Sequence, residues 1–318
     1  MKSKRLCVVS ICGLMLLLVT TACQDYEVKT IVNKDGSGVR TVTLTLDPYK
    51  EYAESTVTLE DAEKLFRVSD AGDWDMTWSG PPRDPESRPI YTRNRKIKRI
   101  DDWSSELDEV FIRGTLHSSE LDQIELRSRI DVETGQGPSG TSYTYRERFW
   151  WIGLKPVLTD WFTDVICGSI QERYGIRDEA RVAELRGLYA GVIDLKWKTF
   201  IDNDKLEAEG SDMISTLVRN TKRIIERTGK RVDSEDLTAI LTADLMDEDH
   251  KILDRAEREL PGVFGAGFTG IKLSISLPGI IMESNADKTD GNTVTWEFGA
   301  LDPLKAPKEL FVRSEIIE

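Results

Sequence analysis

"ISLPGIIMESNADKTDGNTVTWEF" occupies Ile275 to Phe298, near the end of the 318-residue chain. In its first part, Ser276 separates the apolar residues Ile275 and Leu277. Its last part alternates Val294, Trp296 and Phe298 with polar residues. Period-two alternation is typical of a strand with one buried face. Since the Asp-Gly between them favours a tight turn, the stretch predicts two antiparallel strands joined by that turn.

Pro278 and Gly279 interrupt the first of these strands. Proline cannot donate to a strand ladder, so this dipeptide predicts a bulge or bend that curves the sheet. A curved antiparallel sheet covered by amphipathic helices encloses an apolar space at its concave face. If side chains fill that space it is a core, and if they do not it is a ligand cavity. The sequence leaves both outcomes open.

Other stretches share the period-two pattern. Residues 28–47 predict a hairpin around "KDGSG", and residues 123–151 predict a second one around "GQGPSG". "KELFVRSEII", near the C-terminus, predicts a last strand. In the second hairpin, Arg146 and Arg148 alternate with aromatic residues. Because the whole chain is acidic, we expect them to lie on a cross-strand, salt-bridged solvent face rather than on a nucleic-acid surface.

The apolar spacing changes to three and four residues between Lys155 and about Leu260, which predicts four or more amphipathic helices. Gly175 and Gly229 are expected to end two of them, and Ser211 to cap a third. A shorter helical pattern covers residues 101–111, with Trp103, Leu107, Val110 and Phe111 on one face.

The fold class expected from these patterns is α+β, a curved antiparallel β-sheet with a large all-helical insertion. The expected boundaries are a signal peptide at 1–22, the N-terminal part of the β-rich domain at 23–154, the helical insertion at 155–262, and C-terminal strands completing the β-rich domain at 263–318.

The N-terminus begins with three cationic residues, followed by an apolar run over 6–19. That run is shorter than the ~20 residues of a spanning helix and fits an export signal. "TTAC" then places Ala22 directly before Cys23. This resembles a bacterial lipoprotein signal, in which the cysteine is acylated and the chain is cut before it. The resemblance implies a protein anchored to a membrane by lipid on Cys23, with its domain outside the cytoplasm; the alternative is an ordinary secretory signal cut at Ala22.

Charge and cysteine content agree with that location. The formal net charge is −13, with 43 basic and 56 acidic residues. Loss of residues 1–22 removes three basic residues and no acids, so the mature charge is −16. Such a chain should repel nucleic acid and anionic lipid heads, and acyl chains must therefore hold it at the membrane. Cys7 and Cys12 leave with the signal, so Cys167 remains alone and is expected to be a partly buried structural thiol.

Candidate catalytic and ligand motifs are weak. "GAGFTG" at 265–270 spells the dinucleotide pattern, but a helix precedes it and a strand follows, which is the reverse of the required order. We expect a hinge there and no cofactor. "DEDHK" at 247–251 places its acids on different sides of a helix, so no metal site is expected. Trp150 and Trp151 point to opposite sheet faces, which leaves sugar stacking by one of them as an alternative.

The quoted stretch also resembles the C-terminal strand pair of the LppM-like family of bacterial lipoproteins. The matching residues form its turn and bend motif: Pro278, Gly279, Asn285, Gly291, Asn292, Val294 and Trp296. "DGSG" at 35–38 agrees as well. The resemblance covers only the β-rich ends, and the helical block departs from the family's compact pattern. It implies an envelope-anchored binding module with a lipid or glycolipid as its ligand.

Three functions follow as hypotheses. The first is a non-catalytic envelope lipoprotein that binds an apolar or amphiphilic ligand or an envelope protein. The second is a structural or assembly lipoprotein whose acidic helical block is the protein-interaction surface. The third is an envelope hydrolase, which requires carboxylates converging in a cleft.

Overall fold

The computed structural model describes residues 25–45, 74–79, 90–105, 108–113, 124–201, 203–246, 255, 259–260 and 270–317. Contacts within the chain divide it into two compact units. The helical unit includes residues 154–258, and the β unit comprises residues 21–153 and 259–318. The combination of helices and strands confirms the α+β class.

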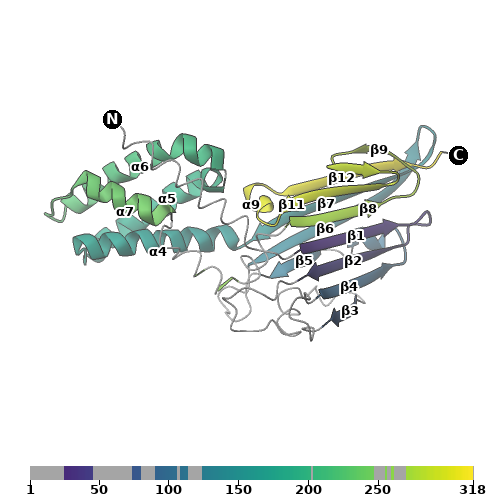
Figure 1. Ribbon diagram of the computed structural model, residues 1–318, viewed down its shortest axis with the longest axis horizontal. Helices are drawn as coiled ribbons and strands as arrows, with labels where there is room; N and C mark the ends of the chain where they lie inside the picture. The colour runs from purple at the N-terminus through teal and green to yellow at the C-terminus, as the bar shows by residue number, and fades with distance from the viewer. Residues whose placement is uncertain are drawn as a thin grey trace. The chain divides into compact units, whose positions relative to one another are not determined.

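All the strands that the structure describes belong to the β unit (Figure 1). In chain order they are β1 (Asp25–Val32), β2 (Gly38–Thr45), β3 (Trp74–Ser79), β4 (Ile90–Ile97), β5 (Asp108–Arg113), β6 (Glu125–Gly137), β7 (Gly140–Ile152), β8 (Gly270–Ser276), β9 (Ile280–Ser284), β10 (Lys288–Asp290), β11 (Thr293–Gly299) and β12 (Lys308–Glu315). The helices are α3 (Asp102–Ser105), α4 (Leu154–Tyr174), α5 (Glu179–Ile201), α6 (Asn203–Glu226), α7 (Ser234–Met246) and α9 (Asp302–Lys305).

The strands form two sheets rather than the one antiparallel sheet expected. One has the order β10-β11-β8-β1-β2-β4-β3 and the other β5-β6-β7-β12-β9. The seven-stranded sheet is mixed, because β1 and β8 run parallel with Tyr26 opposite Ile271. A hairpin forces its two strands to be antiparallel, but β1 and β8 are separated in sequence by the whole helical unit, which permits the parallel arrangement.

The predicted hairpins over 28–47 and 123–151 are confirmed as β1–β2 and β6–β7. Gly36 supplies the left-handed turn of the first hairpin with a φ of 78°. The expected last strand is β12, which pairs with β7. In each case the buried residues alternate along the strand as the period-two pattern requires.

The stretch from 275 to 298 is not a simple hairpin. β8 and β11 do pair, with Ile275 opposite Val294. The chain between them, however, forms β9 in the five-stranded sheet and β10 in the seven-stranded sheet. Pro278 and Gly279 lie between β8 and β9 and therefore mark the crossing from one sheet to the other. The expectation of a single polar turn was wrong, because the pattern does not reveal that "IIMES" pairs with a strand of the second sheet.

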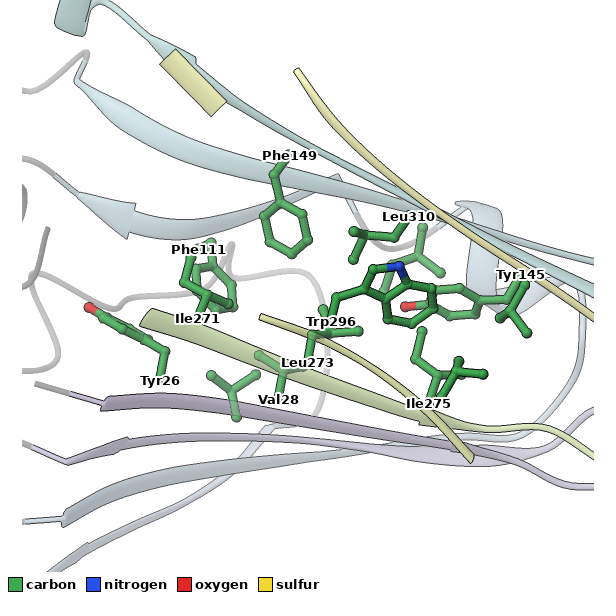
Figure 2. Packing of buried hydrophobic residues seen from close by; sticks show 14 of the residues in the cluster. Tyr26, Val28, Phe111, Tyr145, Phe149, Ile271, Leu273, Ile275, Trp296 and Leu310 are labelled. Atoms are coloured by element: carbon green, nitrogen blue, oxygen red, sulfur yellow. The ribbon is translucent and has the colours of Figure 1, made fainter. Parts of the chain in front are cut away.

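Side chains fill the space between the two sheets. Figure 2 shows Tyr26, Val28, Leu273 and Trp296 from one sheet pointing toward Tyr145, Phe149 and Leu310 from the other. The ring of Phe111 lies 5.5 Å from that of Tyr26 and 5.5 Å from that of Phe149, centroid to centroid. Of the two outcomes left open above, the described residues form a packed core here.

The predicted helix over 101–111 was wrong. Only α3 is helical, and the chain from Asp108 onward is strand β5. Trp103 is fully buried, and its indole Nε1 donates to the carbonyl of Gly36 at 3.0 Å. Phe111 enters the core from an irregularity in the β5–β6 pairing between Val110 and Ile112. Pairing with β6 therefore overrides the helical spacing of these residues.

In the helical unit, each of the four long helices packs against the next and α7 packs against α4. Gly175 and Gly229 have φ of 57° and 79° and follow the ends of α4 and α6, as predicted. Ser211 was expected to cap a helix but lies inside α6, which begins eight residues earlier, at Asn203. No helix in the part of the chain that the structure describes is long and apolar enough to cross a bilayer.

Candidate functional site

The outer face of the seven-stranded sheet carries polar side chains in continuous rows. On β1, Val28 and Thr30 are buried, whereas Glu27 and Lys29 point away from the core. Strand pairing extends this alternation across the sheet. One row, in order across the strands, is Lys288, Thr295, Ser274, Lys29, Thr41 and Asn94. The next row includes Glu297, Lys272 and Glu27.

Hydroxyl groups link neighbouring strands within these rows. Ser274 and Thr295 lie 3.1 Å apart, Oγ to Oγ1, and Ser276 and Thr293 lie 2.7 Å apart between the corresponding atoms. Further along the face, Thr41 donates from Oγ1 to Oδ1 of Asn94 at 2.7 Å. The face is therefore an ordered array of side-chain donors and acceptors.

A groove of about 440 Å³ lies over β10, β11, β8 and β1. Its lining residues are Glu27, Lys29, Thr30, Ile31, Lys272, Ser274, Ser276, Lys288, Asp290, Thr293, Thr295 and Glu297. Lys29 forms an ion pair with Glu27 at 3.1 Å. Among the described residues, Lys272 and Lys288 form no ion pair. Hydroxyls and ammonium groups suit a polyhydroxylated or anionic ligand.

The outer face of the five-stranded sheet carries arginines instead. Arg146 pairs with Glu133 at 3.0 Å across β6 and β7, and Arg148 pairs with Glu309 at 3.0 Å across β7 and β12. These pairs confirm the salt-bridged solvent face predicted from the alternation. A smaller groove of about 300 Å³ lies over this face.

The interior of the β unit holds an ion pair that sequence reasoning missed. Arg40 on β2 and Glu147 on β7 are fully buried, and Nη2 of Arg40 lies 2.7 Å from Oε1 of Glu147. The hydroxyl of Tyr145 donates to Oε2 of Glu147 at 2.7 Å, and Nη1 of Arg40 donates to Thr30 at 2.9 Å. Burial raises the pKa of Tyr145 well above its ordinary value. The only signal was that Glu147 stands in period two with Tyr145 and Phe149.

The turn and bend motif holds the crossing between the two sheets together. Asn285 accepts from Nε1 of Trp296 at 2.9 Å and from the amide of Phe311 at 2.8 Å, and its Nδ2 donates to Glu309 O at 2.9 Å. Asn292 donates from Nδ2 to the carbonyl of Leu277 at 2.9 Å. These side chains join β11, β12 and the end of β8.

The two glycines of the motif differ in their surroundings. Gly279 has a φ of 88°, and a Cβ there would lie 2.2 Å from the carbonyl oxygen of Glu315. Gly291 has a φ of 59°, but a Cβ there would meet nothing within 4 Å. Pro278 is buried, and its carbonyl accepts from Oγ of Ser314 at 2.7 Å. Close approach of two backbones therefore requires glycine at 279.

The lone thiol is buried in the helical unit. Cys167 lies on α4 and is 1% exposed, so it is buried more deeply than the partly buried thiol expected from the sequence. Burial raises its pKa to about 11, so the thiolate nucleophile is disfavoured at neutral pH.

The two tryptophans considered for sugar stacking lie on opposite faces of β7. Trp151 is partly buried, and its Nε1 donates to the carbonyl of Ala300 at 2.8 Å, while Trp150 lies opposite Arg127 on the other face. Cys23, residues 265–269 of the glycine-rich segment and residues 247–251 lie outside the described residues.

The buried carboxylates in the described ranges each have a donor close by. Besides Glu147, the carboxylate of Glu125 pairs with Arg127 at 2.7 Å, and that of Glu315 accepts from the amide of Ser139. Within the same ranges, no three His, Cys, Asp or Glu side chains are grouped so that they could hold a metal ion.

No protein-family profile matches the sequence, and no curated protein matches it either. The chain is similar to the NMR structure of the folded domain of Mycobacterium tuberculosis LppM, with 5% sequence identity and a TM-score of 0.32. The alignment covers 93% of this chain and 92% of that one. At this TM-score the likeness is too weak to assign a common fold.

Proposed function

We propose that this protein is a lipid-anchored envelope protein that binds the polar head of an amphiphile and has no catalytic role. The lipoprotein-type signal ending at Cys23 supports the anchor. The groove on the outer face of the seven-stranded sheet supports the binding role.

The anchor holds the β unit close to the bilayer. β1 begins at Asp25, only two residues after Cys23. Two extended residues span at most ~7 Å, so the end of the sheet where β1 begins lies near the lipid surface. The parallel partner β8 begins at the same end, since Tyr26 is opposite Ile271. The groove extends along these two strands and can meet molecules that project from the bilayer.

The packed interior determines how an amphiphile would bind. Because side chains fill the space between the sheets, acyl chains would stay in the bilayer while the head group enters the outer groove. The hydroxyls of Ser274 and Thr295 suit sugar hydroxyls, and the lysines suit an acidic group. The observation that carries the proposal is that Lys288 lies at one end of this hydroxyl row and Lys272 in the adjacent row, and that neither has an ion-pair partner among the described residues.

The anchor is tested by intact mass measurement of the full protein purified from bacterial membranes in detergent. We expect a chain that starts at Cys23 and carries acyl mass. A Cys23→Ser variant should leave the membrane fraction. A native chain that begins at Met1 without acyl mass would contradict the anchor.

Head-group binding is tested with the unacylated chain from residue 24 and phosphatidylcholine vesicles with or without a sulfated galactolipid. The variant Lys272→Gln/Lys288→Gln should weaken binding to the glycolipid vesicles roughly fivefold or more, since each charge-assisted contact contributes about 1 kcal/mol. The matched control is Lys96→Gln on β4, an exposed lysine of the same sheet that does not line the groove. Equal binding by both variants would exclude the groove.

A second candidate is an assembly role for the acidic helical unit. It is favoured by Leu195 on α5, which is 83% exposed. Photocrosslinking from position 195 in cells should then capture one defined envelope protein. Labelling without any discrete product would remove this candidate.

A further inference from the structure

We propose that Arg129 and Arg148, on the outer face of the five-stranded sheet, together bind a phosphate group. This site lies on the other sheet from the lysine groove and is independent of the proposed function.

Strand register places the two arginines directly opposite each other. Arg129 on β6 is directly opposite Arg148 on β7. Both side chains are exposed, while the adjacent Ile130 and Phe149 are buried, so both arginines lie on the outer face. Like charges directly opposite each other on an antiparallel pair are destabilising. The sheet therefore holds an unfavourable pair that a bound anion would relieve.

Three other arginines of this face, among those whose side chains the structure describes, each have a carboxylate partner. Arg127 pairs with Glu125 at 2.7 Å, Arg146 with Glu133 at 3.0 Å, and Arg313 with Glu283 at 3.9 Å. Arg129 forms no ion pair among the residues the structure describes. Arg148 contacts Glu309 through Nε, which leaves its two terminal nitrogens available.

These available donors line the groove of about 300 Å³ on this face. Its lining residues are Arg129, Ile130, Asp131, Arg146, Glu147, Arg148 and Glu309. The groove has room for an anion several times the volume of a water molecule, which is ~30 Å³.

The chemistry of two guanidinium forks selects phosphate over carboxylate. One fork already saturates the two oxygens of a carboxylate in a bidentate pair. A phosphomonoester has three strongly accepting oxygens, so it can occupy both forks at once. The acidic chain as a whole repels long polyanions, which favours a single phosphate group over a nucleic acid.

The test uses the full acylated protein in detergent, titrated with inorganic phosphate and with glycerol 3-phosphate by calorimetry. We expect saturable binding of both ligands by the native protein. Arg129→Gln should weaken it at least tenfold and Arg129→Lys less strongly. The matched control is Arg313→Gln on β12, which removes an arginine of the same face that pairs with Glu283 and does not line the groove; it should change affinity less than threefold.

A thermal measurement gives a readout that a structural role would not produce. In phosphate-free buffer, Arg129→Gln should unfold at the same temperature as the native protein or higher, because it removes the opposed charges. Added phosphate should raise the Tm of the native protein and leave that of Arg129→Gln unchanged. A Tm increase that is equal in both proteins would overturn the proposal, as would the absence of saturable phosphate binding at about 10 mM.

The source of the phosphate is distinguished with nanodiscs. Binding to phosphatidylglycerol nanodiscs that Arg129→Gln abolishes would identify a lipid phosphate, and binding confined to the soluble esters would identify a soluble one. A negative result for phosphate binding would not contradict head-group binding in the lysine groove, since Lys272→Gln/Lys288→Gln and Arg129→Gln are assayed with different ligands.

Discussion

Strand β7 has two faces that use the same kinds of charge in opposite ways. On its inner face, Glu147 pairs with Arg40, and neither side chain reaches solvent. On its outer face, Arg148 pairs with Glu309, and the two side chains are 55% and 61% exposed. The two side chains of the inner pair are desolvated, so their charged atoms need hydrogen-bond or ion-pair partners within the protein. The outer pair keeps its water and contributes little to stability, which leaves its arginine free to take another anion.

Breaking the inner pair tests the buried side of the comparison and has the largest expected effect. Glu147→Leu or Arg40→Met should lower the free energy of unfolding by about 3–5 kcal/mol, because each removes the ion-pair partner of a buried charge. Urea unfolding followed by near-UV circular dichroism of the aromatic core measures this. The double variant Arg40→Met/Glu147→Leu should recover most of the loss. A double variant as unstable as the singles would show that the pair is not a unit.

The second-largest effect on stability is expected at the crossing between the two sheets. Gly279→Ala should cost about 2–4 kcal/mol, because it combines a left-handed backbone with a clash against the backbone of Glu315. Gly291→Ala is the matched control and should cost about 1 kcal/mol, since only the backbone conformation is unfavourable there. Thermal unfolding of both variants gives the difference. Equal losses would show that the close approach at 279 has no energetic weight.

Asn285 ties β11 to β12 across the edge of the two sheets. Asn285→Ala should lower the free energy of unfolding by about 1–3 kcal/mol, because it leaves Nε1 of Trp296 and the amide of Phe311 without their acceptor. Asn285→Asp keeps the acceptor and should lose less. Trp296 is almost fully buried, and Asn285→Ala removes the hydrogen-bond acceptor of its Nε1. The tryptophan fluorescence of Asn285→Ala should therefore be shifted relative to the native protein. An unchanged spectrum and stability would contradict this role.

Cys167 extends the comparison of buried and exposed groups to the helical unit. Its thiol should resist alkylation by iodoacetamide at pH 8 and react rapidly once the protein is unfolded in urea. Burial raises the folded-state pKa to about 11, above the unfolded value of about 8.5. The neutral thiol therefore contributes stability fully below about pH 8.5, and this is lost as the pH rises toward 11. Rapid alkylation of the folded protein at pH 8 would contradict this.

Removing an outer ion pair should have the smallest effect. Glu133→Ala, which leaves Arg146 in solvent, should change the free energy of unfolding by less than about 1 kcal/mol. The change should shrink further in high salt, which screens exposed charges. A loss similar to that of Glu147→Leu would remove the distinction between the two faces of β7.

Local patterns predicted much of the secondary structure and little of the candidate site. The β1–β2 and β6–β7 hairpins follow from period-two alternation and turn glycines. The helix expected over 101–111 failed because Phe111 is drawn into the core by pairing of β5 with β6. The opposition of Arg129 and Arg148 depends on the register of a 13-residue pairing that no residue within either strand reveals.

By itself, the sequence determined the α+β class, the faces of strands that are buried and the glycines that end α4 and α6. These are local properties, set by the alternation of side chains and by the backbone conformations that each residue allows. Only the tertiary structure decided that β1 lies parallel to β8, that β9 joins the second sheet and that Arg40 meets Glu147. A strand's pattern states which of its faces avoids water, whereas the choice of neighbour depends on how all strands bury their apolar faces together.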